Sequence, residues 1–131
     1  VKRIAPLKIN GDVVGPVSRL AALVGYIDQL GERFALPIVS FGHAGNGNLH
    51  VNIMVQPSDP QQMENARQAL RALFTQVLAL GGTLSGEHGI GSEKRNYVSM
   101  EIDAPSLEMM HLIKAQFDPH GLLNPGKLLP A

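Results

Sequence analysis

Residues 37–55, PIVSFGHAGNGNLHVNIMV, decide the fold, because two strand-like segments flank a glycine-rich turn. Residues 37–41 have the apolar composition of a buried strand, and residues 49–55 form a second apolar strand. Side chains alternate between the two faces of a strand, so His50 and Asn52 share one face and leave the other to apolar residues. The stretch therefore predicts a β-hairpin with one polar face and one core face.

Strand and helix signals alternate on either side of this hairpin. The second helix has a strong start signal, because Asp59 can cap it and Pro60 occupies its first position. In chain order we expect a strand over 5–14, a helix over 15–32, the hairpin, a helix over 59–80, a short strand over 83–85, a short basic helix from 92 and a helix over 105–117. The order βαββαβ predicts an α+β, ferredoxin-like antiparallel sheet with additional C-terminal helices.

Composition narrows the classes of function. The chain has 131 residues, enough for one domain with a core of its own, and we expect residues 1–131 to form one domain. Its 11 basic and 11 acidic residues balance, and no basic run interleaves with aromatic residues, so nucleic acid is not an expected partner. Cysteine is absent, which excludes disulfides and thiolate metal ligands and agrees with a reducing compartment. No apolar stretch is long enough for a transmembrane segment, and we expect a cytoplasmic protein, either free or peripheral to the inner face of the membrane.

Three side chains in two glycine-rich segments suggest a metal site. His43 ends the first hairpin strand and His50 begins the second, so paired or diagonal positions bring their imidazoles close together. Glu87 follows the expected fourth strand and could add a carboxylate. Two imidazoles and a carboxylate suit zinc, iron or manganese and leave coordination positions open. For the two histidines alone, ordinary hydrogen bonds at a hairpin turn are the simpler interpretation.

His88 is the candidate catalytic residue. It is adjacent to Glu87, and in an irregular glycine-flanked loop both side chains can converge on one site. An imidazole beside a metal can act as a general base. The alternative interpretation is a surface histidine with no role in chemistry.

Three ordered motifs resemble one family of proteins. They are FGHAGNGNLHVN at 41–52, SGEHGIGSEKR at 85–95 and FDPHGLLNPGK at 117–127, and KINGD at 8–12 also resembles the family's early segment. Together they are similar to the C-terminal domain of FAD-linked oxidases in the vanillyl-alcohol-oxidase superfamily. That group includes D-lactate dehydrogenase, the glycolate oxidase FAD subunit and D-2-hydroxyglutarate dehydrogenase. The resemblance covers essentially the whole chain.

The resemblance implies an activity and a role for each motif residue. The intact enzyme would oxidise a small 2-hydroxy acid to the 2-oxo acid and pass hydride to FAD bound by another domain of the same polypeptide. The reduced flavin would then pass its electrons to a downstream electron acceptor. The residues implied are His43, His50 and Glu87 as ligands of a divalent metal, His88 as the active-site histidine, Lys8 and Asn52 near the substrate carboxylate, and Asn124 and Lys127 toward the flavin.

The chain departs from the family pattern in two ways. Asn46 stands where relatives usually have Asp, which removes a charge near the expected metal and could change metal choice. The flavin-binding domain and the arginine expected upstream of Lys8 are not in this sequence, so we expect a fragment that is inactive alone. Two other functions remain open, a metal or small-acid binding module that needs no base and a metal-dependent hydrolase that needs no flavin.

Overall fold

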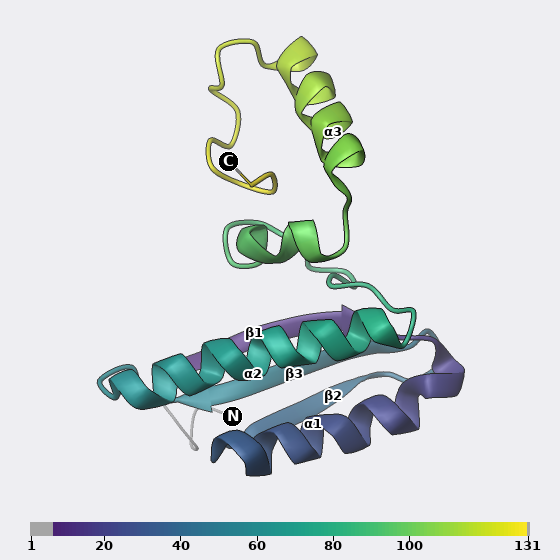
Figure 1. Cartoon of the computed structure of the whole chain (residues 1–131), viewed down its shortest axis with the longest axis vertical. Helices are drawn as coiled ribbons and strands as arrows, with labels where there is room; N and C mark the ends of the chain where they lie inside the picture. The colour runs from purple at the N-terminus through teal and green to yellow at the C-terminus, as the bar shows by residue number, and fades with distance from the viewer. Residues whose placement is uncertain (1–6, 131) are drawn as a thin grey trace. The chain divides into compact units, whose positions relative to one another are not determined.

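The computed structural model describes residues 7–130, and the chain divides into two compact units, 1–87 and 88–131. Figure 1 shows the elements of both units coloured along the chain. The expectation that residues 1–131 act as one domain stays a prediction.

The first unit is an α+β layer in which helices cover an antiparallel sheet (Figure 1). In the described part of the chain the sheet order is β1-β3-β2. The elements are β1 (Leu7–Val14), a 3-10 turn (Val17–Arg19), α1 (Leu20–Phe34), β2 (Ile38–His43), β3 (Asn48–Val55) and α2 (Pro60–Ala79). The predicted ferredoxin-like order is confirmed for these elements, and the hairpin forms where the sequence predicted it.

Helix α2 begins where its sequence provides a cap. The side chain of Asp59 accepts hydrogen bonds from the backbone N–H groups of Gln61 and Gln62, at 2.9 and 3.1 Å, and Pro60 follows it. These bonds satisfy donors that have no partner within the helix. The buried face of α2 lies against β1, where Gly11 leaves space for Leu70 and Leu73. The helix therefore covers the face of the sheet that carries the core.

Strand register places the core and the polar residues on opposite faces of the sheet. In β3 the apolar side chains alternate with polar ones, and Val51 and Ile53 lie on the helix side. Asp12 of β1 lies opposite His50, and Asn10 lies opposite Asn52. The polar residues of β1 and β3 thus share the face that α1 and α2 do not cover.

The short fourth strand expected over residues 83–85 does not form, and this prediction was wrong. Thr83 makes one isolated antiparallel bridge with Val14, and residues 84 and 85 add no further pairing to it. Gly82 explains part of this, because a Cβ there would lie 2.2 Å from the carbonyl oxygen of Val14. The chain approaches β1 closely at this point and then leaves the sheet, so the fourth position of the ferredoxin-like plan is reduced to one residue.

Gly47 in the hairpin turn is expected to be intolerant of a side chain. Its φ is +76°, and a Cβ would lie 2.0 Å from the carbonyl oxygen of Gly15. That oxygen belongs to the backbone, so no change of side-chain rotamer could remove the clash. Gly47→Ala should destabilise the chain by about 1–3 kcal/mol, the usual cost of a strained backbone position. The neighbouring Gly45→Ala is the matched control, because nothing lies within 4 Å of the position of its Cβ. Urea unfolding gives the free energy of unfolding of both variants. Equal free energies would contradict the prediction that position 47 does not tolerate a side chain.

The second unit contains a 3-10 helix (η2, Arg95–Met100), α3 (Ala104–Phe117) and an irregular tail. The helix over 105–117 is confirmed, and the short basic helix expected from Ser92 begins later, at Arg95. Asp118 organises the tail, since its carboxylate accepts the backbone N–H groups of Leu122 and Leu123 and the side chain of Lys114. The hydrogen bond from Lys114, together with the two backbone N–H groups, lowers the pKa of Asp118. The FDPHGLLNPGK motif therefore has a structural function of its own.

Helix α3 leaves its apolar side chains exposed within the described structure. None of its residues is buried, and Met109, Leu112, Ile113 and Phe117 are all more than half exposed. Across residues 7–130, no helix combines the length and hydropathy required to cross a bilayer.

Candidate metal centre

The face of the sheet opposite α1 and α2 carries most of the site residues that the sequence predicted for the first unit. Lys8 lies on β1, His50 and Asn52 lie on β3, and His43 ends β2. The pairing of Phe41 with His50, and of His43 with Asn48, puts His43 diagonally across from His50. A diagonal position is one of the two arrangements that the hairpin sequence predicted.

His43, His50 and Glu87 are brought together as predicted. One ligand atom from each lies within 4.8 Å of the others, and the two imidazole rings have centroids 5.7 Å apart in an edge-to-face arrangement. His50 Nε2 lies 3.4 Å from a Glu87 carboxylate oxygen. The side chain of Glu87 is 54% exposed, whereas His50 is 7% exposed, so one ligand is held in the sheet and another is open to solvent. Two imidazoles and a carboxylate at this spacing fit a borderline divalent cation such as zinc, iron or manganese.

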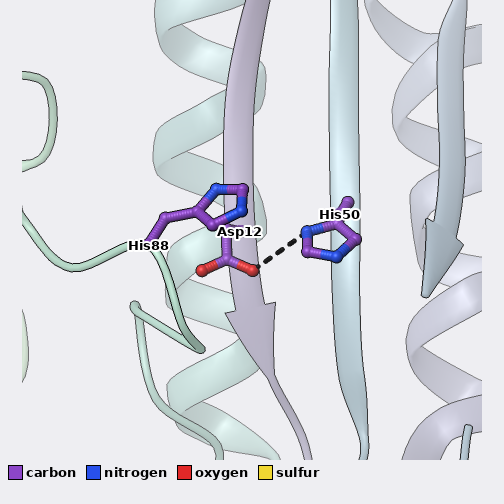
Figure 2. Close-up of side chains that lie close together, drawn as sticks. All are labelled: Asp12, His50 and His88. Carbon is purple, nitrogen blue, oxygen red and sulfur yellow. Dashed lines mark ion pairs between the residues drawn. The ribbon is translucent and has the colours of Figure 1, made fainter. Parts of the chain in front are cut away.

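Asp12 supports this group from the neighbouring strand. Figure 2 shows Asp12 on β1 and His50 on β3 facing one another, and the atoms Asp12 Oδ1 and His50 Nδ1 are 3.2 Å apart. The other oxygen of Asp12 accepts the backbone N–H groups of Gly86 and Glu87, at 3.1 and 3.0 Å. Metal-binding histidines commonly have a carboxylate on the nitrogen that does not face the ion. The donor set and its support therefore both suit a metal centre.

Several buried amide oxygens on or beside this face have no hydrogen-bond partner among residues 7–130. They are the side-chain oxygens of Asn10, Asn48 and Asn52. Asn52 is 1% exposed and lies directly opposite Asn10 in the register. Buried polar atoms are normally paired, and an unpaired one calls for an explanation such as a ligand or an ion. The predicted substrate residue Asn52 thus has a free acceptor on the same face as the histidines.

Two glycines of the motifs allow close backbone approach around Asn48. A Cβ at Gly42 would lie 2.1 Å from the backbone oxygen of Asn48, and one at Gly86 would lie 2.6 Å from its side-chain oxygen. A side chain at residue 86 would displace the amide of Asn48, and one at residue 42 would clash with the backbone of Asn48. These two glycines therefore permit the close packing around Asn48.

The remaining predicted residues belong to the second unit or to its boundary. His88 is exposed and is the first residue of that unit, and its covalent link to Glu87 keeps the two backbones adjacent. Asn124 has a φ of +48° and its carbonyl accepts the backbone N–H of Lys127 at 3.2 Å. Arg95 donates to the carbonyl of Gly126 at 2.9 Å, so it fastens this turn to η2. The flavin contacts of Asn124 and Lys127 stay predictions.

Asp12 is the residue that the sequence reasoning missed. Its position is visible in the alternation of β1, because Asp12 shares a face with Lys8 and Asn10 and is flanked by apolar residues. An acidic residue inside a strand that pairs with a buried strand is unusual and indicates a buried partner. Only the register with β3 identifies that partner as His50.

Comparison with known proteins identifies the family of the chain. The family model of the C-terminal domain of FAD linked oxidases matches residues 1–128. Among curated proteins, the chain is 37% identical over 126 residues to glycolate oxidase subunit GlcD of Bacillus subtilis, a match that covers 96% of this chain and 27% of that protein. It is 36% identical over 119 residues to a mitochondrial cytochrome-type D-lactate dehydrogenase of Arabidopsis thaliana, covering 91% of this chain and 21% of the relative.

A third relative extends the range of substrates named. D-2-hydroxyglutarate dehydrogenase of Stutzerimonas stutzeri is 36% identical over 127 residues, which cover 93% of this chain and 27% of that protein. The chain spans about a quarter of the length of these curated relatives. The family match extends over nearly the whole sequence, from the polar strand β1 to the turn after α3. The chain therefore belongs to the family of FAD-linked oxidase C-terminal domains.

Proposed function

We propose that this chain is the substrate-binding and metal-binding part of a flavin-dependent dehydrogenase that oxidises a small 2-hydroxy acid to the 2-oxo acid. The observation that carries the proposal is the polar sheet face, on which two imidazoles lie near unpaired amide oxygens and close to the carboxylate of Glu87 from the adjoining loop. The relatives named above include enzymes for glycolate, D-lactate and D-2-hydroxyglutarate, all 2-hydroxy acids. FAD would be held by another domain of the same polypeptide, with a further electron acceptor downstream.

His43, His50 and Glu87 are the residues that would hold a divalent metal in this proposal. Such an ion supplies Lewis acidity, which polarises the oxygens of a bound hydroxy acid and lowers the pKa of the hydroxyl. FAD, when present, supplies the hydride acceptor. The metal and FAD would supply the reactive chemistry, and the side chains of this chain would position the substrate.

The side chains of this chain would bind and orient the substrate. The Lys8 ammonium would attract the substrate carboxylate, a role supported by its position on the same face as Asn10 and Asn52. Asn52 is held by a buried backbone in the central strand, so its amide can fix the orientation of the acid. His88 would accept the proton from the 2-hydroxyl oxygen as a general base. Asn124 and Lys127 would lie toward the flavin.

The experiment that tests this function uses the full-length polypeptide with its flavin. Under anaerobic conditions, D-lactate, glycolate or D-2-hydroxyglutarate should bleach the flavin absorbance, and prior treatment with a chelator should slow that bleaching. Asn52→Leu should weaken substrate binding by about 10-fold, because it removes one hydrogen bond to a charged or polar partner. Gln56→Leu is the control, since Gln56 is exposed just beyond β3.

The outcomes separate the proposal from its two alternatives. A protein that hydrolyses esters or amides at the same rate without flavin would be a hydrolase. A protein that binds metal and hydroxy acid but never bleaches its flavin would be a binding module. An unchanged substrate dissociation constant in Asn52→Leu would remove Asn52 from the substrate site.

A further inference from the structure

We propose that Asp12 is a positioning residue that sets both His50 and the backbone of Glu87 for a divalent cation. The proposal rests on the metal site of the proposed function and assigns a role to a residue outside its ligand set. Its basis is that the two carboxylate oxygens of Asp12 have different partners. Each oxygen contacts a different part of the candidate centre.

The first oxygen acts on His50. Asp12 Oδ1 lies 3.2 Å from His50 Nδ1, and the two residues are direct partners in the register of β1 and β3. A carboxylate at Nδ1 favours the tautomer with the proton on that nitrogen. The lone pair of the imidazole then resides on Nε2, the nitrogen that lies 3.4 Å from Glu87. Asp12 thereby selects which nitrogen of His50 can bind a cation.

The second oxygen acts on the segment that carries Glu87. Asp12 Oδ2 accepts the backbone N–H of Gly86 at 3.1 Å and that of Glu87 at 3.0 Å. These residues lie 74 and 75 positions away in the sequence, beyond the point where the chain leaves the sheet at Thr83. Sheet pairing does not continue to Glu87, so these two hydrogen bonds tie its backbone to β1.

Burial strengthens the contacts of Asp12 with His50 and with the loop, because water does not compete for its carboxylate. Asp12 is 1% exposed, and a buried carboxylate is tolerated only when donors surround it. The two contacts with the loop are hydrogen bonds to a carboxylate, which are stronger than those between neutral groups, whereas the contact with His50 is a close approach of 3.2 Å that acts through charge. One buried side chain therefore contacts both the histidine of the central strand and the backbone of the loop that carries Glu87.

The variant that tests this role is Asp12→Asn, which keeps the shape of the side chain. An amide has one oxygen and one NH₂ group, so it can accept from the loop or from His50 but cannot serve both at once. Binding of Zn²⁺ or Mn²⁺ to the 131-residue chain, measured by calorimetry, should weaken by about 10–100-fold, as expected for a residue that supports a ligand. Asp28→Asn, an exposed change of the same kind on α1, should leave the affinity unchanged. Equal affinities for Asp12→Asn and the unchanged chain would overturn the proposal.

A second measurement needs neither metal nor a folded variant. In the metal-free chain at mildly alkaline pH, nitrogen NMR should place the proton of His50 on Nδ1, and the amides of Gly86 and Glu87 should exchange with deuterium more slowly than that of Gly89. A proton on Nε2, or fast exchange at both amides, would overturn the role of Asp12. If instead these signals are as expected but no cation binds to the unchanged chain, the metal site fails and the positioning of His50 and Glu87 by Asp12 remains.

Discussion

In the full-length enzyme, His88→Ala is expected to slow reduction of the flavin by roughly 10²–10⁴-fold, the range for loss of a positioned general base. The residue lies next to Glu87 in the chain, so under the proposed function a metal held by Glu87 would bring the substrate hydroxyl near His88. The metal content should stay near that of the unchanged enzyme, since His43, His50 and Glu87 all remain. Stopped-flow bleaching of the flavin and metal analysis of the same preparation give the two measurements.

Glu87→Ala is the companion variant for that experiment. It removes one of three proposed ligands and should therefore lose metal as well as rate. Loss of metal in His88→Ala with retention in Glu87→Ala would exchange the two roles. Unchanged flavin reduction in both variants would show that the pair has no part in the chemistry.

His50→Ala is expected to have the largest effect on metal binding, with a loss of affinity of at least about 100-fold. Loss of a residue that only supports a ligand costs about 10–100-fold, and His50 is proposed as a ligand itself. The substitution also removes the imidazole whose Nδ1 lies 3.2 Å from the buried carboxylate of Asp12. Calorimetric titration with Zn²⁺ and Mn²⁺ measures the change.

His111→Ala is the matched control for His50→Ala. His111 is exposed on α3 and belongs to none of the candidate ligand groups found in residues 7–130. It should bind the cation as the unchanged chain does. If His50→Ala binds equally well, the ligand assignment is wrong, whereas equal losses in both variants would indicate nonspecific binding by surface histidines.

The periodic parts of the fold could be predicted from the sequence. The hairpin and α2 combine regular apolar spacing with strong local signals, a glycine-rich turn in one case and the Asp59 cap in the other. The fourth strand expected over residues 83–85 does not form, because only three residues separate Gly82 from Gly86 and the close approach of Gly82 to Val14 leaves a single bridge. Such short segments are decided by packing against a neighbour and not by their own composition.

The candidate site divides in the same way. His43, His50 and Glu87 could be placed together, because hairpin geometry and the expected order of the sheet bring them to one region. The role of Asp12 could not be predicted, since its two kinds of contact depend on the register with β3 and on hydrogen bonds to a segment 74 residues away. Contacts of that separation have no local signature in the chain.

Strand β3 ties folding and chemistry to the same eight residues. Its apolar side chains support the helices, and its alternate positions carry His50 and Asn52. An inserted or deleted residue within the strand would exchange the two faces from that point on, so histidine and asparagine would face the helices and valine the substrate side. The length of this strand is therefore constrained, and its residues can change more easily by substitution. The positions that face the helices are constrained by stability, and the positions on the other face are constrained by the proposed ligand.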